Sequence, residues 1–292
     1  MKKIVFGICA MVLIASCSGG RKKEAVTEIG HLEEDSQSLP SPAGVQDTSW
    51  VIEDVIPATA DESFADFFYN FASDADFQRS RIVFPISLYK GKGVVRVSQE
   101  DWVYDPLFSR EQVYTVLFDC VEDMEMEKDT AVHSVQVDQM DLAKSLVKRY
   151  YFERIKNVWF LEAINQEKLE EEQSREDFYT FYRQFSCDSA FQLKRLDSPL
   201  VFVTVDPEDE FQILETTLDV GQWFSFRPPL MKEKLTNVHY GQSDEMDSDT
   251  KIVEFKGFGN GFSNTLYFQR RKGIWKPVSY THLRAHETLR HL

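Results

Sequence analysis

An internal repeat of about 100 residues is the feature that most constrains how this chain can fold. Residues 62–86 align without a gap with residues 176–200, and nine positions are identical. The identical pairs are Glu62/Glu176, Phe64/Phe178, Phe67/Phe181, Phe71/Phe185, Asp74/Asp188, Phe77/Phe191, Gln78/Gln192, Arg81/Arg195 and Pro85/Pro199. Each copy ends on a second shared segment, YFERIKNVW at 151–159 and YFQRRKGIW at 267–275. We therefore predict two tandem units, at 61–170 and 171–277, each large enough to hold its own core.

The start of each copy has the spacing of an amphipathic helix. Aromatic residues fall at i, i+3, i+4 and i+7 as Phe64, Phe67, Phe68 and Phe71, and again as Phe178, Phe181, Tyr182 and Phe185. We interpret this face as core packing rather than a cofactor-stacking stripe, because neither copy adds polar groups that would orient a ligand. Asp74 and Asp188 are expected to cap a second short helix. Pro85 and Pro199 are expected to end that helix and begin a strand.

The end of each copy predicts a β-hairpin. Strand-like runs flank Lys156-Asn157 and Lys272-Gly273, where Asn and Gly supply the positive φ of a tight turn. Each unit should therefore run helix, helix, then mostly antiparallel strands, which makes the chain α+β. Trp159 and Trp275 would each lie on the last strand of a unit.

These residues resemble a known fold. Two short aromatic helices, a strand after the proline, and a terminal strand pair with a basic turn and a Trp resemble the nuclear transport factor 2-like (cystatin-like cone) fold. The stretch FFYNFASD at 67–74 and the Arg-x-x-x-Pro spacing resemble a group of uncharacterised bacterial envelope lipoproteins. The resemblance implies a curved antiparallel sheet wrapped on helices into a cone, twice over residues 60–277. It departs after Trp275, so we expect the last strand of the second unit to be truncated and that sheet edge to be poorly packed.

The N-terminus has the pattern of a lipoprotein export signal. Lys2 and Lys3 precede an apolar run at 4–14 that is too short to span a bilayer. The following Ile14-Ala15-Ser16-Cys17 resembles a lipobox. We predict a signal peptide at 1–16 and acylation of Cys17, whose acyl chains would be the membrane anchor. The alternative is an ordinary cleaved signal with an incidental cysteine.

Residues 17–60 are polar and rich in Gly, Ser, Pro and Glu, which predicts a flexible tether. The segment after Cys17 is SGGRKK and not an acidic run. We therefore expect a lipid-anchored protein of the bacterial cell envelope, on the outer membrane and facing the periplasm.

The C-terminal residues 278–292 have a different character. The stretch VSYTHLRAHET at 278–288 resembles a translated sequencing adapter, so we interpret the segment as an artefact. A metal site made by His282 and His286 is the alternative, and the lack of a supporting carboxylate shell or helix cap disfavours it.

Charge and composition exclude some classes of function. The chain has 33 Lys plus Arg against 48 Asp plus Glu, a net charge of -15. No basic stripe interleaved with aromatics is present, so nucleic-acid binding is not expected. The 23 Phe residues and 42% hydrophobic content exclude a wholly disordered chain.

The sequence offers few candidate catalytic groups. His133 and His239 lie in similar segments, VHSVQVDQMD and VHYGQSDEMD, at an offset of 106. The neighbouring anchors have offsets of 121 and 116, so we interpret this match as coincidence. The repeated Arg81 and Arg195 are expected to tie a helix to backbone carbonyls or an acidic partner. Anion binding by these arginines together with Gln78 and Gln192 is the alternative.

Two further groups of residues bear on metals and redox chemistry. Acidic clusters at 119–129 and 244–249 lack calcium-loop spacing, so we interpret them as solvated loops. Cys120 and Cys187 could form a disulfide or remain as buried thiols. We assign no catalytic, cofactor-binding or metal-binding residue and predict no cofactor.

These features predict a lipid-anchored module that binds a ligand or another protein without catalysis. Possible partners are the membrane, a small apolar ligand, or an envelope protein. One alternative is a pocket enzyme, an isomerase, dehydratase or hydrolase of a small apolar substrate. A buried Asp, His or Tyr with a shifted pKa in a closed cavity would favour that enzyme. Another alternative is a scaffold or inhibitor of a second envelope protein.

Overall fold

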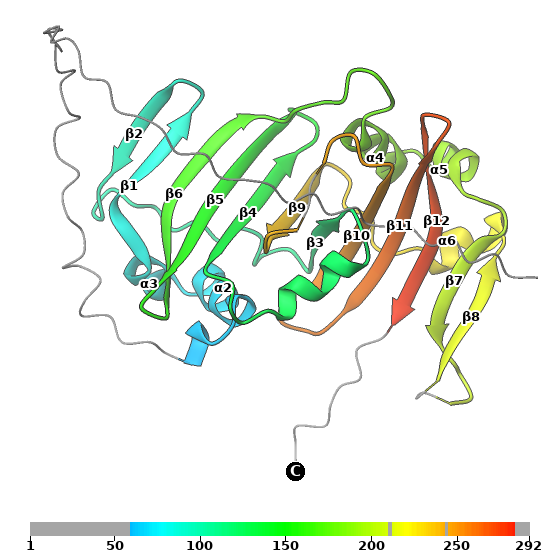
Figure 1. Cartoon of the computed structure of the whole chain (residues 1–292), viewed down its shortest axis with the longest axis horizontal. Helices are drawn as coiled ribbons and strands as arrows, with labels where there is room; N and C mark the ends of the chain where they lie inside the picture. The colour runs from blue at the N-terminus through cyan, green and yellow to red at the C-terminus, as the bar shows by residue number, and fades with distance from the viewer. Residues whose placement is uncertain (1–58, 210–211, 243–244, 284–292) are drawn as a thin grey trace, which may run out of the picture. The chain divides into compact units, whose positions relative to one another are not determined.

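Residues 59–209, 212–242 and 245–283 are described by the computed structural model (Figure 1). The predicted signal peptide, Cys17 and nearly all of the predicted tether therefore lie outside the described residues. The described residues all belong to one compact unit that spans residues 47–292.

Each copy of the repeat begins with the two predicted helices. The first copy has α2 (Phe64–Ser73) and α3 (Ala75–Ser80), and the second has α4 (Phe178–Cys187) and α5 (Ser189–Arg195). Asp74 Oδ1 accepts hydrogen bonds from the backbone N–H groups of residues 76 and 77, both at 2.9 Å. Asp188 does the same for residues 190 and 191 at 2.8 and 3.0 Å. The predicted capping roles of both aspartates are confirmed.

The strands form two six-stranded sheets. Sheet A has the order β2-β1-β6-β5-β4-β9, and sheet B has the order β8-β7-β12-β11-β10-β3. Sheet A comprises β1 (Ile82–Lys90), β2 (Gly93–Val97), β4 (Ser134–Asp141), β5 (Leu146–Ile155), β6 (Val158–Lys168) and β9 (Lys234–His239). Sheet B comprises β3 (Val113–Phe118), β7 (Leu200–Val205), β8 (Ile213–Leu218), β10 (Thr250–Gly257), β11 (Ser263–Arg271) and β12 (Ile274–Leu283).

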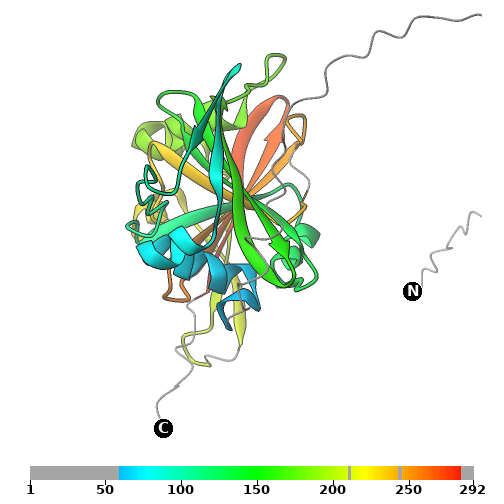
Figure 2. The same cartoon turned by 90° about the vertical axis from the view of Figure 1, so that its left-hand side faces the viewer.

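Short helical turns fill some of the connections. They are η1 (Thr59–Asp61), η2 (Glu122–Lys128), η3 (Val220–Gln222) and α6 (Trp223–Phe226). Figure 2 views the same cartoon from the β2 end of sheet A.

The two halves exchange one strand each. β3 comes from the first half but pairs with β10 in sheet B, and β9 comes from the second half but pairs with β4 in sheet A. Thr115 faces Phe255 across one pair, and Thr236 faces Gln139 across the other. Thr115 and Thr236 thus hold equivalent positions. The same plan occurs twice, but each sheet needs a strand from the other half, so a boundary near residue 170 does not separate two self-contained sheets.

The exchanged strands contact each other through the two threonines. The Thr115 backbone N–H donates to Thr236 Oγ1 at 2.7 Å, and the Thr236 N–H donates to Thr115 Oγ1 at 2.9 Å. Each hydroxyl donates in turn to the other residue's carbonyl, at 2.7 and 2.8 Å. These reciprocal bonds satisfy buried polar groups where the two strands meet.

Two aromatic cores lie beneath the sheets. In the first, Phe152 of β5 lies 5.2–6.2 Å, between ring centroids, from four phenylalanines of α2. In the second, Phe268 of β11 takes the same place against α4. Val238 of the second half packs in the first core, and Leu117 of the first half packs in the second. The aromatic faces are core residues, as predicted.

Both terminal hairpins form with the predicted turns. Lys156 and Asn157 have φ values of 51° and 65°, and Lys272 and Gly273 have 53° and 75°. Each hairpin joins the last two strands of its half, and Trp159 and Trp275 are both 1% exposed.

The expected truncation of the last strand is wrong. β12 continues to Leu283 between β11 and β7, through residues of the adapter-like segment. Tyr280 is fully buried and packs 5.4 Å from the ring of Phe202. A strand between β11 and β7 forms backbone hydrogen bonds on both sides, which any sequence compatible with a strand can make. An aromatic residue that points inward, here Tyr280, then completes the core.

Candidate functional site

The repeated glutamines are structural. Gln78 is fully buried, donates to the Phe71 carbonyl at 3.0 Å and accepts from the Trp102 indole at 3.1 Å. Gln192 repeats both bonds with Phe185 and Trp223, at 2.6 and 2.9 Å. Both amides thus tie the helix pair to the segment that leads into the exchanged strand.

The repeated arginines hold an acidic partner, as predicted. Arg195 makes a two-pronged ion pair with Glu176 at 2.6 and 2.9 Å, and Glu176 also accepts from the Trp275 backbone N–H at 2.7 Å. Arg81 pairs with Asp61 at 2.9 Å. Asp61 Oδ1 accepts from the Trp159 N–H at 3.1 Å, so Asp61, and not the aligned Glu62, is the counterpart of Glu176.

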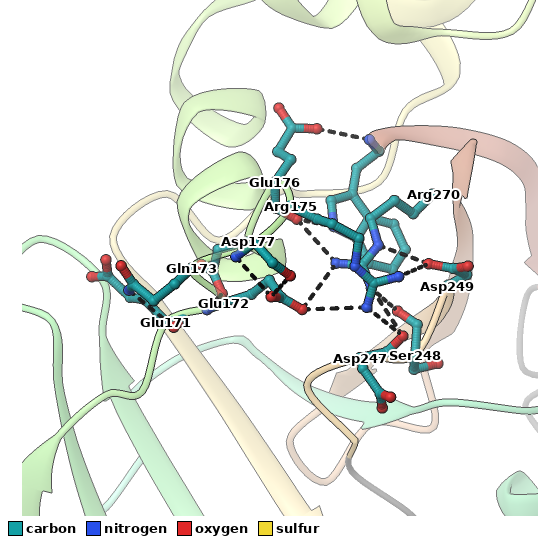
Figure 3. Close-up of polar contacts among 12 residues, drawn as sticks. Glu171, Glu172, Gln173, Arg175, Glu176, Asp177, Asp247, Ser248, Asp249 and Arg270 are labelled. Atoms are coloured by element: carbon teal, nitrogen blue, oxygen red, sulfur yellow. Dashed lines mark hydrogen bonds and ion pairs between the residues drawn. The ribbon is translucent and has the colours of Figure 1, made fainter. Parts of the chain in front are cut away.

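A third arginine, Arg270, lies at the centre of the network in Figure 3. Its guanidinium donates to Asp249 at 2.8 Å and to the carbonyls of residues 247, 248 and 176 at 2.8–3.3 Å. It also lies 5.0 Å from the Trp275 ring centroid. These four hydrogen bonds fix the loop before β10 to the segment that leads into α4, which makes the cluster a structural one.

Neighbouring acids complete that network. Glu172 accepts from the hydroxyl and backbone N–H of Ser174, and these bonds lower its pKa to about 2. Arg175 donates to both Glu172 and Asp249. Residues 245–249 form an exposed loop, as predicted, and Asp249, although 60% exposed, also pairs with Arg175 and Arg270.

The first acidic cluster is more ordered than predicted. Residues 122–128 form η2, where Glu127 pairs with Lys256 of sheet B. Asp119 and Lys251 form an ion pair of 2.5 Å, and both side chains are less than a tenth exposed. These acids bind lysines that lie far along the sequence, which a local pattern could not reveal.

The histidines and cysteines do not assemble a site. His239 pairs with Gln136 of β4, so its counterpart in the first half is Phe118 and not His133. The interpretation of the His motif as coincidence is confirmed. Cys120 and Cys187 are both free thiols and both exposed, so neither the disulfide nor the buried thiols considered from the sequence are formed.

A cavity of about 330 Å³ lies against sheet A where the exchanged strand β9 joins it. Four polar residues form a row across its strands, Thr236 of β9, Gln139 of β4, Lys148 of β5 and Gln166 of β6. Residues directly opposite one another in adjacent strands share a face of the sheet. Apolar lining comes from Leu107, Phe108, Val113 and Leu146. The second half therefore supplies part of a cavity that lies on the first half's sheet.

A half-buried carboxylate, that of Asp105, holds the lysine of that row. Asp105 Oδ2 accepts from Lys148 Nζ at 2.6 Å and from the Tyr150 hydroxyl at 2.7 Å, and Asp105 Oδ1 accepts from the Leu107 N–H at 2.9 Å. Gln139 Oε1 lies 3.3 Å from the same Tyr150 hydroxyl. The acceptors of Asp105 are thus committed. The remaining N–H groups of Lys148 and the Gln139 amide nitrogen are left as donors toward the cavity.

The second half lacks this arrangement. Its structurally equivalent residues are Phe226 for Asp105, Phe255 for Gln139, Asn264 for Lys148 and Leu266 for Tyr150. Phe255 and Leu266 are fully buried, and Asn264 is only 3% exposed. The second half keeps a threonine in the row (Thr115) and has His282 in place of Gln166, but Phe255 interrupts the row and no lysine is present in it.

Electrostatics favour fixed charges over proton transfer. Burial raises the pKa of Asp105, but the Lys148 charge and the hydrogen bonds from Lys148, Tyr150 and Leu107 outweigh it and lower the pKa overall. Burial, and then the Asp105 charge, raises the pKa of the Tyr150 hydroxyl. Asp105 therefore stays ionised and Tyr150 neutral near pH 7, while a general base works best with a pKa near the working pH.

We expect Asp105→Asn to destabilise the fold by about 1–3 kcal/mol at pH 7, because Lys148 and Tyr150 lose a charged acceptor. A lowered carboxyl pKa stabilises the fold above the unfolded value of about 4, and this stabilisation is lost as the pH falls through the folded pKa. The difference between wild type and variant should therefore shrink between pH 7 and pH 3 in urea titrations. The exposed Glu100→Gln is the control, and an equal penalty at both pH values would contradict the prediction.

Neither a metal-binding cluster nor a membrane-spanning helix is found among the described residues. The described residues contain no cluster of three His, Cys, Asp or Glu side chains that could hold a metal ion. None of the helices they form has the length and apolar character needed to cross a bilayer.

Comparison with known proteins supports the fold. A family model described as "Domain of unknown function (DUF4348)" matches residues 45–282. The crystal structure of an NTF2-like protein from Bacteroides fragilis NCTC 9343 is 50% identical, over 78% of this chain and 99% of that chain, with a TM-score of 0.76. No curated protein matches the chain. The predicted nuclear transport factor 2-like fold is confirmed, and neither description states an activity.

Proposed function

We propose that this chain, which belongs to the DUF4348 family, binds a small carboxylate with an apolar body in the cavity on sheet A. The observation that carries the proposal is the donor row of Gln139, Lys148 and Gln166, which the second half replaces with Phe255, Asn264 and His282. The cavity volume of about 330 Å³ lies at the lower end of small-molecule sites, which are about 300–1,000 Å³.

The chemistry of the wall selects the ligand class. Apolar residues 107, 108, 113 and 146 suit a hydrocarbon chain or ring. Lys148 and the free amide groups offer donors, so the polar end of the ligand should present acceptor oxygens. The charged lining comprises three lysines (Lys144, Lys148 and Lys234) and two acids (Glu111 and Asp141), and Asp141 is paired with Lys144. This excess of positive charge favours a carboxylate over an ammonium group.

Binding is favoured over the alternative of a pocket enzyme. Behind the lining residue Lys148 lie Asp105, held as a carboxylate, and Tyr150, held as a phenol. The other charged lining residues are Glu111, Asp141, Lys144 and Lys234. Neither Asp105 nor Tyr150 is poised to accept or donate a proton near neutral pH. The directions of the two pKa shifts therefore support a module that binds its ligand without changing it chemically.

We expect octanoate to bind when it is titrated into the protein in a calorimeter. Octan-1-ol, which has the same chain length but no charge, is the comparison ligand. We expect Lys148→Met to weaken octanoate binding about tenfold, since one charge-assisted hydrogen bond is lost, and to leave octanol nearly unchanged. Gln139→Phe copies the residue of the second half and should fill the cavity, so it should abolish both. Gln136→Phe, on the opposite face of the same strand, is the control for folding.

Two outcomes would overturn the proposal. One is that wild type binds neither compound. The other is that Gln139→Phe, with a thermal midpoint like that of the control, binds octanoate as well as wild type does.

We also propose that acyl chains on Cys17 anchor the protein on the outer membrane, facing the periplasm. The supporting pattern is Lys2 and Lys3, the short apolar run and the Ile-Ala-Ser-Cys sequence. Metabolic labelling with a radioactive fatty acid should mark wild type and not Cys17→Ser, and equal labelling of both would exclude this anchor.

A further inference from the structure

Each sheet has an outer strand farthest from the exchanged strand, β2 in sheet A and β8 in sheet B, that is unpaired on one side. β2 pairs with β1 and β8 pairs with β7, and no other described strand pairs with either (Figure 1). The two strands hold equivalent places, since each follows the first strand of its half. Such edges present free backbone N–H and C=O groups to any extended strand that approaches them.

Both edges are also exposed and partly apolar. Val94 and Val95 of β2 are each 56% exposed, and Ile213 and Leu214 of β8 are 66% and 38% exposed. Neither strand contains a proline, one of the devices that blocks edge pairing. The apolar side chains would lose contact with water if another strand were added.

The charges on the two edges have opposite signs. The β1–β2 hairpin carries Lys90, Lys92 and Arg96, all exposed and without an ion pair among the described residues. The β7–β8 hairpin carries Asp206, Glu208 and Glu215, likewise without an ion pair among those residues. Two β2 edges would repel each other, as would two β8 edges, whereas β2 against β8 attracts.

We propose that the chain associates with copies of itself head to tail, the β2 edge of one copy pairing with the β8 edge of the next. If Arg96 of one copy lies opposite Glu215 of the next, β2 and β8 overlap along most of their length in both the parallel and the antiparallel orientation. Each copy keeps one free edge of each sign, so the contact is heterologous and builds linear chains rather than a closed dimer.

A second copy is favoured over a different partner because both complementary surfaces belong to this one chain. Protection of the edges by charge alone is the competing explanation, since lysines and other charges on an edge also discourage pairing. Charges that only protect an edge can have either sign, whereas self-association requires opposite charges on the β2 and β8 edges.

Sedimentation velocity on the purified chain separates these explanations. At low ionic strength the weight-average mass should rise continuously with protein concentration, and added salt should reverse the rise. We expect K90E/K92E/R96E, with two acidic edges, and E208K/E215K, with two basic edges, each to weaken association about tenfold or more. A mixture of the two variants should recover it, because each then supplies the edge that the other needs.

K168E/K194E/K272E is the control, because it makes the same change in net charge at exposed lysines away from both edges. It should associate as wild type does. A wild type that stays monomeric at all concentrations, or a mixture that associates no better than its components, would overturn the proposal.

Discussion

Arg270→Met is expected to lower the free energy of unfolding by about 3–5 kcal/mol, the range found when one partner of a buried charge network is removed. Its side chain is 1% exposed and serves Asp249 and three backbone carbonyls. Met fills similar volume but donates no hydrogen bond, so the buried carbonyls lose their partners. Urea unfolding followed by circular dichroism would measure the loss.

The neighbouring Arg271 provides a matched control. It is 54% exposed, forms an ion pair with Asp197 at 2.8 Å and donates one hydrogen bond to Gln269 at 2.6 Å. Surface pairs contribute about 0–1 kcal/mol, so Arg271→Met should cost little. Equal losses for the two variants would show that the network of Figure 3 does not fix the loop before β10.

Phe152→Ala is expected to destabilise both halves together, by about 3–5 kcal/mol. Phe152 is fully buried in the first core, against the four phenylalanines of α2. Because β3 and β9 are exchanged, loss of the first core also removes a strand from sheet B. A truncation in one half should therefore lower the unfolding midpoint of the other.

Fluorinated tryptophan makes this measurable by NMR, since Trp159 reports on the first core and Trp275 on the second. Both signals should disappear in one transition, in wild type and in the variant. If Trp275 keeps its wild-type midpoint while Trp159 shifts, the halves unfold independently and the exchange does not couple them.

Local signals in the sequence predicted much of the fold correctly. The aromatic spacing of α2 and α4, the caps at Asp74 and Asp188 and the turns at 156–157 and 272–273 each depend on residues close together in the chain. Capping and positive φ are decided within a few residues, so these elements could be assigned without knowledge of the rest.

Identity between the copies did not point to the candidate site, because the residues identical in both halves serve the fold. Gln78 and Arg81, kept in both halves, tie the helices to neighbouring segments of the fold. The cavity row involves residues that differ between the halves, such as Lys148 against Asn264. The signal available in the sequence was the set of equivalent positions at which the two halves have different residues.

The sequence by itself determined the repeated plan, its helices and its hairpins, because short-range spacing and turn chemistry specify them. Only the tertiary structure decided that β3 and β9 change places, since a strand makes the same backbone hydrogen bonds in either sheet and nothing local distinguishes the two pairings. That long-range choice also places Thr236 beside Gln139 and so completes the cavity. It could be known only once all strands were in position.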